Sequence, residues 1–126
     1  MGDLRISERS NNAAHRHSVQ VSDRDLVAAL IDKLGVSIVA FMVDRDKTTV
    51  RRWAKGESAL PLEANRALRL VYQVFKLLES VESDHTIRAW FIGMNPQLGD
   101  QSPAEAVRDD NLKDVLEAAR AFEVGG

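Results

Sequence analysis

The sequence predicts an all-α protein in which a small helical head is joined by one long central helix to a second helical module. Apolar residues from Leu62 to Val81 recur at three- and four-residue steps, which is the spacing of one face of a helix. Serines in capping positions precede several shorter apolar stretches on both sides of this run. Glycines and short polar clusters separate those stretches and indicate the turns between them.

The central stretch carries two neighbouring apolar rows, a wider stripe than one packing surface needs. We therefore expect it to be buried on two sides, either by the two ends of its own chain or by a second copy. Leu70, Val74 and Leu77 are the predicted dimer interface, on the condition that the chain's own helices leave them uncovered. A homodimer is expected on that condition.

Composition narrows the functional classes. The chain has 126 residues, enough for one domain or for two very small ones that share a core. It has no cysteine, which excludes disulfides, thiol catalysis and thiolate metal sites. No apolar run approaches the roughly 20 residues of a membrane span, so we expect a cytoplasmic protein with no membrane partner.

The net charge of −2 is divided unevenly along the chain. Residues 1–56 carry 10 Lys and Arg against 7 Asp and Glu, whereas residues 57–126 carry 7 against 12. A basic front half and an acidic back half indicate different partners for the two halves.

Residues 1–21 are polar, lack periodicity and are predicted to form a flexible arm. It either contacts DNA phosphates or is simply a disordered start. His15 and His17 lack a third ligand nearby, so no metal site is expected.

Residues 22–61 are predicted to form three short helices and a loop. Ser22 caps a helix from Asp23 to Leu34, which Gly35 ends. Ser37 is expected to cap a second helix, Ile38 to Val43, and Asp44-Arg45-Asp46 forms the turn. The third helix runs from Lys47 to Lys55, and a loop over 57–61 leads to the central helix.

Two short helices joined by a tight turn, the second with polar and basic residues around a buried Val and Trp, describe a helix-turn-helix. Trp53 is expected to be a core residue rather than a base-stacking one. The side chains expected to reach DNA are of the types that bind phosphates and base edges. They are Arg45, Lys47, Thr48, Thr49, Arg51, Arg52 and Lys55.

The segment SIVAFMVDRDKTTVRRWAKGE, from Ser37 to Glu57, resembles the DNA-binding part of Xre-like, phage-repressor-type regulators. The alternative is that Arg51 and Arg52 belong to an ordinary solvated face. Asp44 and Asp46 also cancel part of the local positive charge.

Beyond the central helix, Ser83-Asp84 is expected to cap a helix that ends near Phe91. A loop rich in turn residues follows, and Ser102-Pro103 starts the next short helix. The last helix is predicted from Asn111 to Phe122, with an apolar stripe along one face.

The stretch WFIGMNPQLGDQSPAEAV, from Trp90 to Val107, resembles the toxin-binding domain of the Xre/MbcA/ParS antitoxin family. The resemblance covers roughly residues 25–124. In that family a glycine usually follows Leu-Gly, and here Asp100 stands in its place.

The resemblance implies an antitoxin of a type II toxin–antitoxin system. Its partner would be a cognate RES-domain toxin that consumes NAD, and the complex would bind its own promoter DNA. The C-terminal end would cover the toxin's active site, which assigns toxin contact to Phe122, Glu123, Val124, Gly125 and Gly126. Residues 62–126 would then be the central helix and toxin-binding domain. The alternative is that these last five residues are only the frayed end of a helix.

An enzymatic role is not expected, since no nucleophile–base pair, phosphate-binding glycine loop or metal-ligand spacing appears. His85 and the Asp109-Asp110 pair are interpreted as capping, turn or surface residues. No cofactor or metal is expected. The alternative function is a plain helix-turn-helix repressor whose acidic half is a helical dimerisation domain, although such a repressor would not need the Trp90–Val107 segment.

Overall fold

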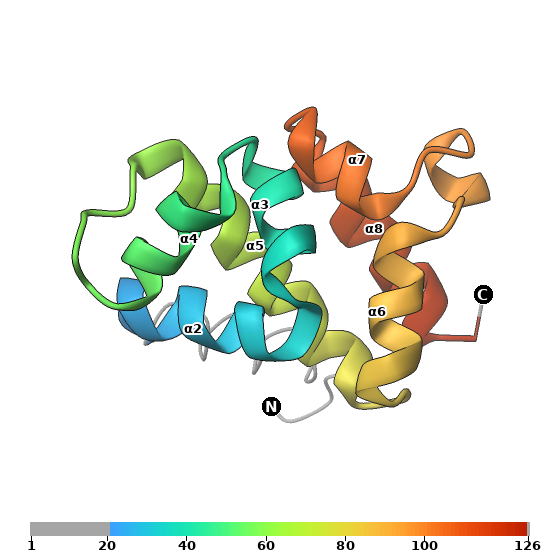
Figure 1. Cartoon of the computed structure of the whole chain (residues 1–126). Helices are drawn as coiled ribbons and strands as arrows, with labels where there is room; N and C mark the ends of the chain where they lie inside the picture. Colours follow the sequence, from blue (N-terminus) through green and yellow to red (C-terminus); the bar gives the residue numbers. More distant parts are fainter. Residues whose placement is uncertain (1–20, 126) are drawn as a thin grey trace, which may run out of the picture.

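The computed structural model describes residues 21–125, which form an all-helical structure without strands in that range, as predicted (Figure 1). The first three helices are α2 (Asp23–Leu34), α3 (Val36–Val43) and α4 (Lys47–Ala54). The long central helix is α5 (Leu62–Glu79). It is followed by α6 (Asp84–Ile92), the 3-10 turn η1 (Pro96–Leu98), α7 (Pro103–Arg108) and α8 (Leu112–Glu123).

Most of the predicted helix starts are confirmed by side-chain caps. The hydroxyl groups of Ser22, Ser83 and Ser102 accept hydrogen bonds from backbone N–H groups in the first turns of α2, α6 and α7. At α7 the cap is reciprocal, because Glu105 also accepts from the Ser102 N–H at 2.8 Å. Pro103 occupies the first turn of α7, where its missing N–H costs no hydrogen bond.

The predicted start of α3 was wrong. Ser37 does not cap the helix, which begins at Val36, directly after Gly35 and two residues before the predicted start at Ile38. Gly35 has a φ of 89° and ends α2 while it opens α3. A residue without Cβ accommodates this reversal at little cost, so the chain turns within a single residue.

The far end of α5 also differs from the prediction, which placed it at Val81. The Ser80 hydroxyl donates to the carbonyl oxygen of Leu77 at 2.7 Å, and the N–H groups of Ser80 and Val81 bond three residues back. These bonds tighten the last turn, and the α-helix ends at Glu79.

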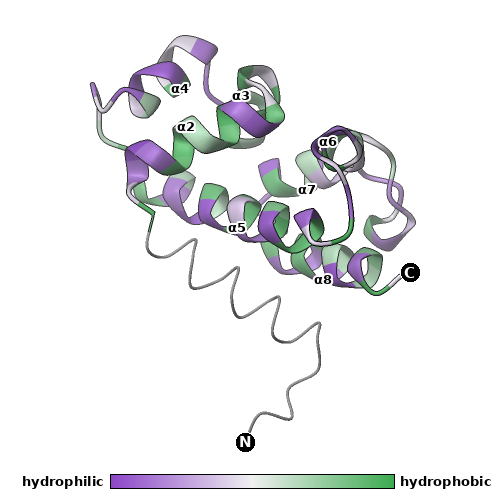
Figure 2. Ribbon diagram, turned by 90° about the horizontal axis from the view of Figure 1, so that it is seen from below, coloured by the Kyte–Doolittle hydropathy of each residue, from purple (hydrophilic) through white to green (hydrophobic). Residues whose placement is uncertain are grey.

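Helix α5 lies at the centre of the molecule and is covered on both sides. Ten of its 18 residues are buried, more than a helix with one packed face requires. It contacts α2, α3, α6 and α8 (Figures 1 and 2). The buried residues of all seven helices within the described range form one hydrophobic cluster, so both predicted segments, 22–61 and 62–126, contribute to one core.

The predicted dimer interface is wrong as placed. Val74 and Leu77 are 0% exposed within a single chain, and Leu70 is only half-buried. The condition for the prediction was that the chain's own helices leave this row uncovered, and they cover it. A homodimer therefore stays a prediction that needs another surface.

The predicted N-terminal arm, 1–21, lies outside the described residues except for Val21, which is half-buried against the core. In the part of the chain that the structure describes, no single helix is long and apolar enough to cross a membrane. The pair α2 and α3 reaches that length and composition only together, across a 120° bend.

The two-sided burial of α5 can be tested by comparing two leucines of the same row. Leu77→Ala should lower the free energy of unfolding by about 2–5 kcal/mol, because it leaves a cavity in a closed core. Leu70→Ala is the matched control, and its half-exposed site should cost about half as much or less. Urea unfolding followed by circular dichroism measures both, and equal losses would contradict this description of the core.

Candidate functional site

The segment α3–turn–α4 places one apolar face of α4 in the core. Val50 is 0% exposed and Trp53 is 4% exposed, which confirms that Trp53 is a core residue. The turn begins with Asp44 in the left-handed conformation, at a φ of 54°. It ends with Asp46, whose carboxylate accepts the N–H of Thr49 at 2.7 Å and caps α4. The cap at Asp46 was missed from the sequence, where this residue was assigned only to the turn.

The opposite face of α4 and its C-cap residue present four positive charges to solvent. All four side chains are exposed, and none forms an ion pair within residues 21–125. They are Lys47, Arg51, Arg52 and Lys55. Thr48 is exposed beside them, whereas Thr49 is half-buried. Five of the seven predicted DNA-contacting side chains therefore lie exposed, four on α4 and Lys55 directly after it.

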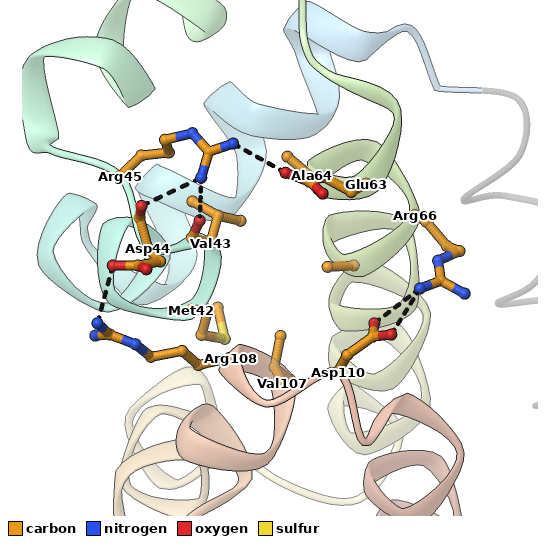
Figure 3. A pocket seen from close by; sticks show the side chains of 11 residues that line it. Met42, Val43, Asp44, Arg45, Glu63, Ala64, Arg66, Val107, Arg108 and Asp110 are labelled. Atoms are coloured by element: carbon orange, nitrogen blue, oxygen red, sulfur yellow. Dashed lines mark hydrogen bonds and ion pairs between the residues drawn. The ribbon is translucent and has the colours of Figure 1, made fainter.

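Arg45 is held elsewhere. Its guanidinium donates to the carbonyl oxygens of Val43 and Asp44, at 3.1 and 3.2 Å, and pairs with Glu63 on α5 at 3.0 Å (Figure 3). Arg45 therefore differs from the cations of α4 in having an ion-pair partner, and that pair connects the α3–α4 turn to the central helix.

Arg45 lines a pocket of about 330 Å³ between the α3–α4 turn, α5 and the α7–α8 turn (Figure 3). Two further arginines reach across it: Arg108 pairs with Asp44 at 2.8 Å, and Arg66 pairs with both carboxylate oxygens of Asp110 at 2.8 and 2.9 Å. Each arginine of this pocket already has a carboxylate partner. These ion pairs connect the elements that surround the pocket, and the pocket therefore offers no unpaired arginine to an anion.

Two of those carboxylates stand at strained backbone positions. Asp44 and Asp110 have φ values of 54° and 63°, in the left-handed region that few side chains adopt. Aspartate tolerates this conformation better than most residues. Each pairs with an arginine from a distant element, and no local sequence pattern predicts such long-range pairs.

The loop between α6 and α7 is closed by a buried asparagine. Asn95 is 8% exposed, and its side-chain oxygen accepts the N–H of Gln97 at 2.9 Å. Its carbonyl oxygen accepts the N–H groups of Leu98 and Asp100, both at 2.9 Å. Asp100 has a φ of 68°, a conformation that favours glycine, so the aspartate keeps the backbone turn at this position.

The predicted toxin-contacting residues divide into two groups. Phe122 and Glu123 belong to α8 and are half-buried, and Phe122 packs on Trp90 with ring centroids 6.3 Å apart. One carboxylate oxygen of Glu123, Oε1, is buried without a hydrogen-bond partner among the described residues. Val124 and Gly125 are exposed beyond the helix, and Gly126 lies outside the described residues.

The described residues contain no cluster of side chains suited to a metal ion. Across 21–125, no group of three or more His, Asp or Glu side chains could hold a metal ion. His85 is exposed on the first turn of α6, and Asp109 accepts a hydrogen bond from Gln101 at 2.6 Å. The predicted His15 and His17 lie outside the described residues.

Compared with known proteins, the chain matches no family model, no curated protein sequence and no solved structure.

The hydrogen bonds that Asp46 accepts predict that the free energy of unfolding depends on pH. The hydroxyl and the N–H of Thr49 donate to the carboxylate, and with the charge of Arg52 they hold the pKa of Asp46 below its ordinary value of 3.8. The stabilisation is therefore present above the unfolded-state pKa and is lost as the pH falls through the lower folded-state pKa.

The variant Asp46→Asn keeps a capping side chain but cannot titrate. The wild-type chain should lose free energy of unfolding relative to this variant as the pH falls from about 5 to about 2. Chemical unfolding at a series of pH values measures the difference, and a difference that does not change with pH would contradict the role given to the carboxylate.

Proposed function

We propose that this chain is the antitoxin of a type II toxin–antitoxin system, which binds its own promoter as a repressor and neutralises a RES-domain toxin. The observation that carries the DNA-binding half is the exposed face of α4, with four cations that have no ion pair within the described chain. Exposed Lys and Arg on a helix that follows a tight turn suit phosphate contacts and guanine edges in a major groove.

The way α4 is held favours this use. Its inner face is fixed by Val50 and Trp53, and the preceding turn is tied to α7 and α5 through Arg108 and Arg45. Because packing and ion pairs fix α4 in place, its exposed side chains already lie on one face before binding. Little conformational entropy of the backbone is then lost when the helix binds.

The toxin-neutralising half rests on the resemblance of Trp90–Val107 to the toxin-binding domain, together with the geometry of the tail. Val124 and Gly125 extend past α8 into solvent, and Gly125 has a φ of 90°. An exposed segment that contains glycine is able to enter a cleft that would exclude bulkier side chains. The acidic back half suits a basic, NAD-binding cleft.

DNA binding can be tested with the double variant Arg51→Ala/Arg52→Ala. It should bind a fluorescent duplex from the region upstream of its own gene at least about tenfold more weakly, because phosphate contacts dominate such affinity. The slope of log K against log salt should fall by about 1 for each phosphate contact removed. Fluorescence anisotropy at several NaCl concentrations measures both quantities.

Arg120→Ala provides the matched control, because Arg120 is an exposed arginine on α8, away from α4. Its affinity and salt slope should equal those of the wild-type chain. If the double variant and the control bind alike, the α4 face is not the DNA-binding surface.

The tail can be tested by ending the chain after Glu123, which leaves the packing of Phe122 on Trp90 in place. The full chain, co-expressed with the protein encoded by the adjacent gene, should restore growth, and the shortened chain should not. A chain of full length whose last three residues are serine separates the effect of length from that of the side chains.

Rescue by the shortened chain would contradict the role of the tail. A full chain that forms no complex and rescues nothing, but still binds its upstream DNA in a salt-sensitive way, would instead be a plain repressor.

A further inference from the structure

A groove of about 420 Å³ lies between α3 and the segment in which α6 ends and α7 begins, and none of its lining residues belongs to α4 or to the tail. Ile38 and Phe41 of α3 line it, together with Ile92 at the end of α6 and Ala104 in α7. Phe41 is 40% exposed and Ile92 is 59% exposed, so two large apolar side chains remain in solvent at this groove. Exposed apolar side chains around a concave surface are typical of interaction sites.

The groove has almost no charge with which to select a partner. Glu105 is the one charged side chain among its lining residues, and its Oε1 already accepts the N–H of Ser102 at 2.8 Å. The guanidinium of Arg108 lies over the Phe41 ring, 4.7 Å from the centroid, and pairs with Asp44. Because neither sign of charge is left unpaired by these contacts, the groove complements an apolar surface and not a strongly acidic or basic one.

A contact between two copies of one chain requires a surface that complements itself. In a two-fold interface the same residues come from both copies, so a cluster of unpaired like charges repels its own copy. The outer face of α4 with Lys55 is such a cluster, since its four cations have no ion pair within residues 21–125. The groove meets the requirement, because one surface provides both an apolar hollow and two exposed apolar side chains, Phe41 and Ile92.

The proposed binding of promoter DNA supplies the reason for a second copy. Helix α4 has eight residues, and a single helix of this kind reads one half-site. Helix-turn-helix dimers place two such helices in major grooves one turn, ~34 Å, apart. The row of α5 that the sequence predicted for the dimer contact is covered by the chain itself, whereas the groove is open and leaves α4 free.

We infer that the groove between α3 and the α6–α7 segment is the two-fold interface between two copies of this chain, with Phe41 and Ile92 of each copy packed against the groove of the other. The need for a second copy rests on the proposed function, and the position of the interface rests on the exposed apolar side chains and the paired charges. Burial of those side chains removes apolar surface from water, which stabilises the dimer.

The oligomeric state of the full chain tests the inference without DNA or a partner protein. Sedimentation velocity at protein concentrations from about 1 to about 100 µM should show a monomer–dimer equilibrium that shifts toward the dimer. Ile92→Asp places a charge in the apolar contact of both copies and should raise the dissociation constant of the dimer at least about tenfold.

Val81→Asp is the matched control, because Val81 is a similarly exposed side chain, 47%, beyond the end of α5 and outside the groove lining. It should dimerise as the wild-type chain does. Phe41→Ser removes the exposed ring from the α3 side of the groove without adding a charge. It should also weaken the dimer, and it replaces Ile92→Asp if circular dichroism shows that this variant does not fold.

The outcomes are distinguishable. A wild-type chain that remains a monomer at the highest concentration overturns the inference, and so does a folded Ile92→Asp variant that dimerises as well as the wild-type chain. In both cases the Arg51→Ala/Arg52→Ala variant still decides DNA binding, so the proposed function is judged separately. If Ile92→Asp leaves the dimer intact but weakens binding of the protein encoded by the adjacent gene, that protein occupies the groove and the inference is wrong.

Discussion

The burial of α5 on two sides is the constraint on which the rest of the structure depends. A helix with two apolar rows cannot be stable in water beside a single packing partner, since one row would stay exposed. Here α2 and α3 lie against one part of its surface and α6 and α8 against others, and all share one cluster of buried side chains. The segment before α5 and the segment after it therefore both pack on this helix, and removing either would expose part of its buried surface.

A second level of organisation fixes the surface that α4 presents. The α3–α4 turn opens with a left-handed aspartate, Asp44, which Arg108 holds from 64 residues away. Individual exposed ion pairs contribute little to stability. Their effect here is on position, because Arg108 and Arg45 connect the turn to α7 and to α5 and fix the base of α4 relative to the core.

Local features of the fold could be predicted from the sequence, and long-range ones could not. Ser22, Ser83, Ser102 and Gly35 act through neighbouring backbone groups, so their roles are visible in a few adjacent residues. The start of α3 was misplaced because a glycine with a φ of 89° can end one helix and open the next without a spacer. The width of the apolar stripe on α5 predicted burial on two sides, but periodicity does not say whether the cover comes from the same chain, and it does. The exposed cations of α4 were predicted from their residue types. The ion pair between Arg45 and Glu63 and the groove beside Phe41 depend on long-range contacts, which no local sequence pattern encodes.

Helix α3 connects the core to the turn that positions α4. Its inner face is packed in the core through Val39 and Met42, its outer face leaves Phe41 40% exposed, and its last residue leads into the turn. The guanidinium of Arg108 lies 4.7 Å from the centroid of the Phe41 ring and pairs with Asp44 in that turn. One helix of eight residues and one arginine side chain therefore connect α7 to the base of α4, which is why the position of α4 depends on residues far away in the sequence.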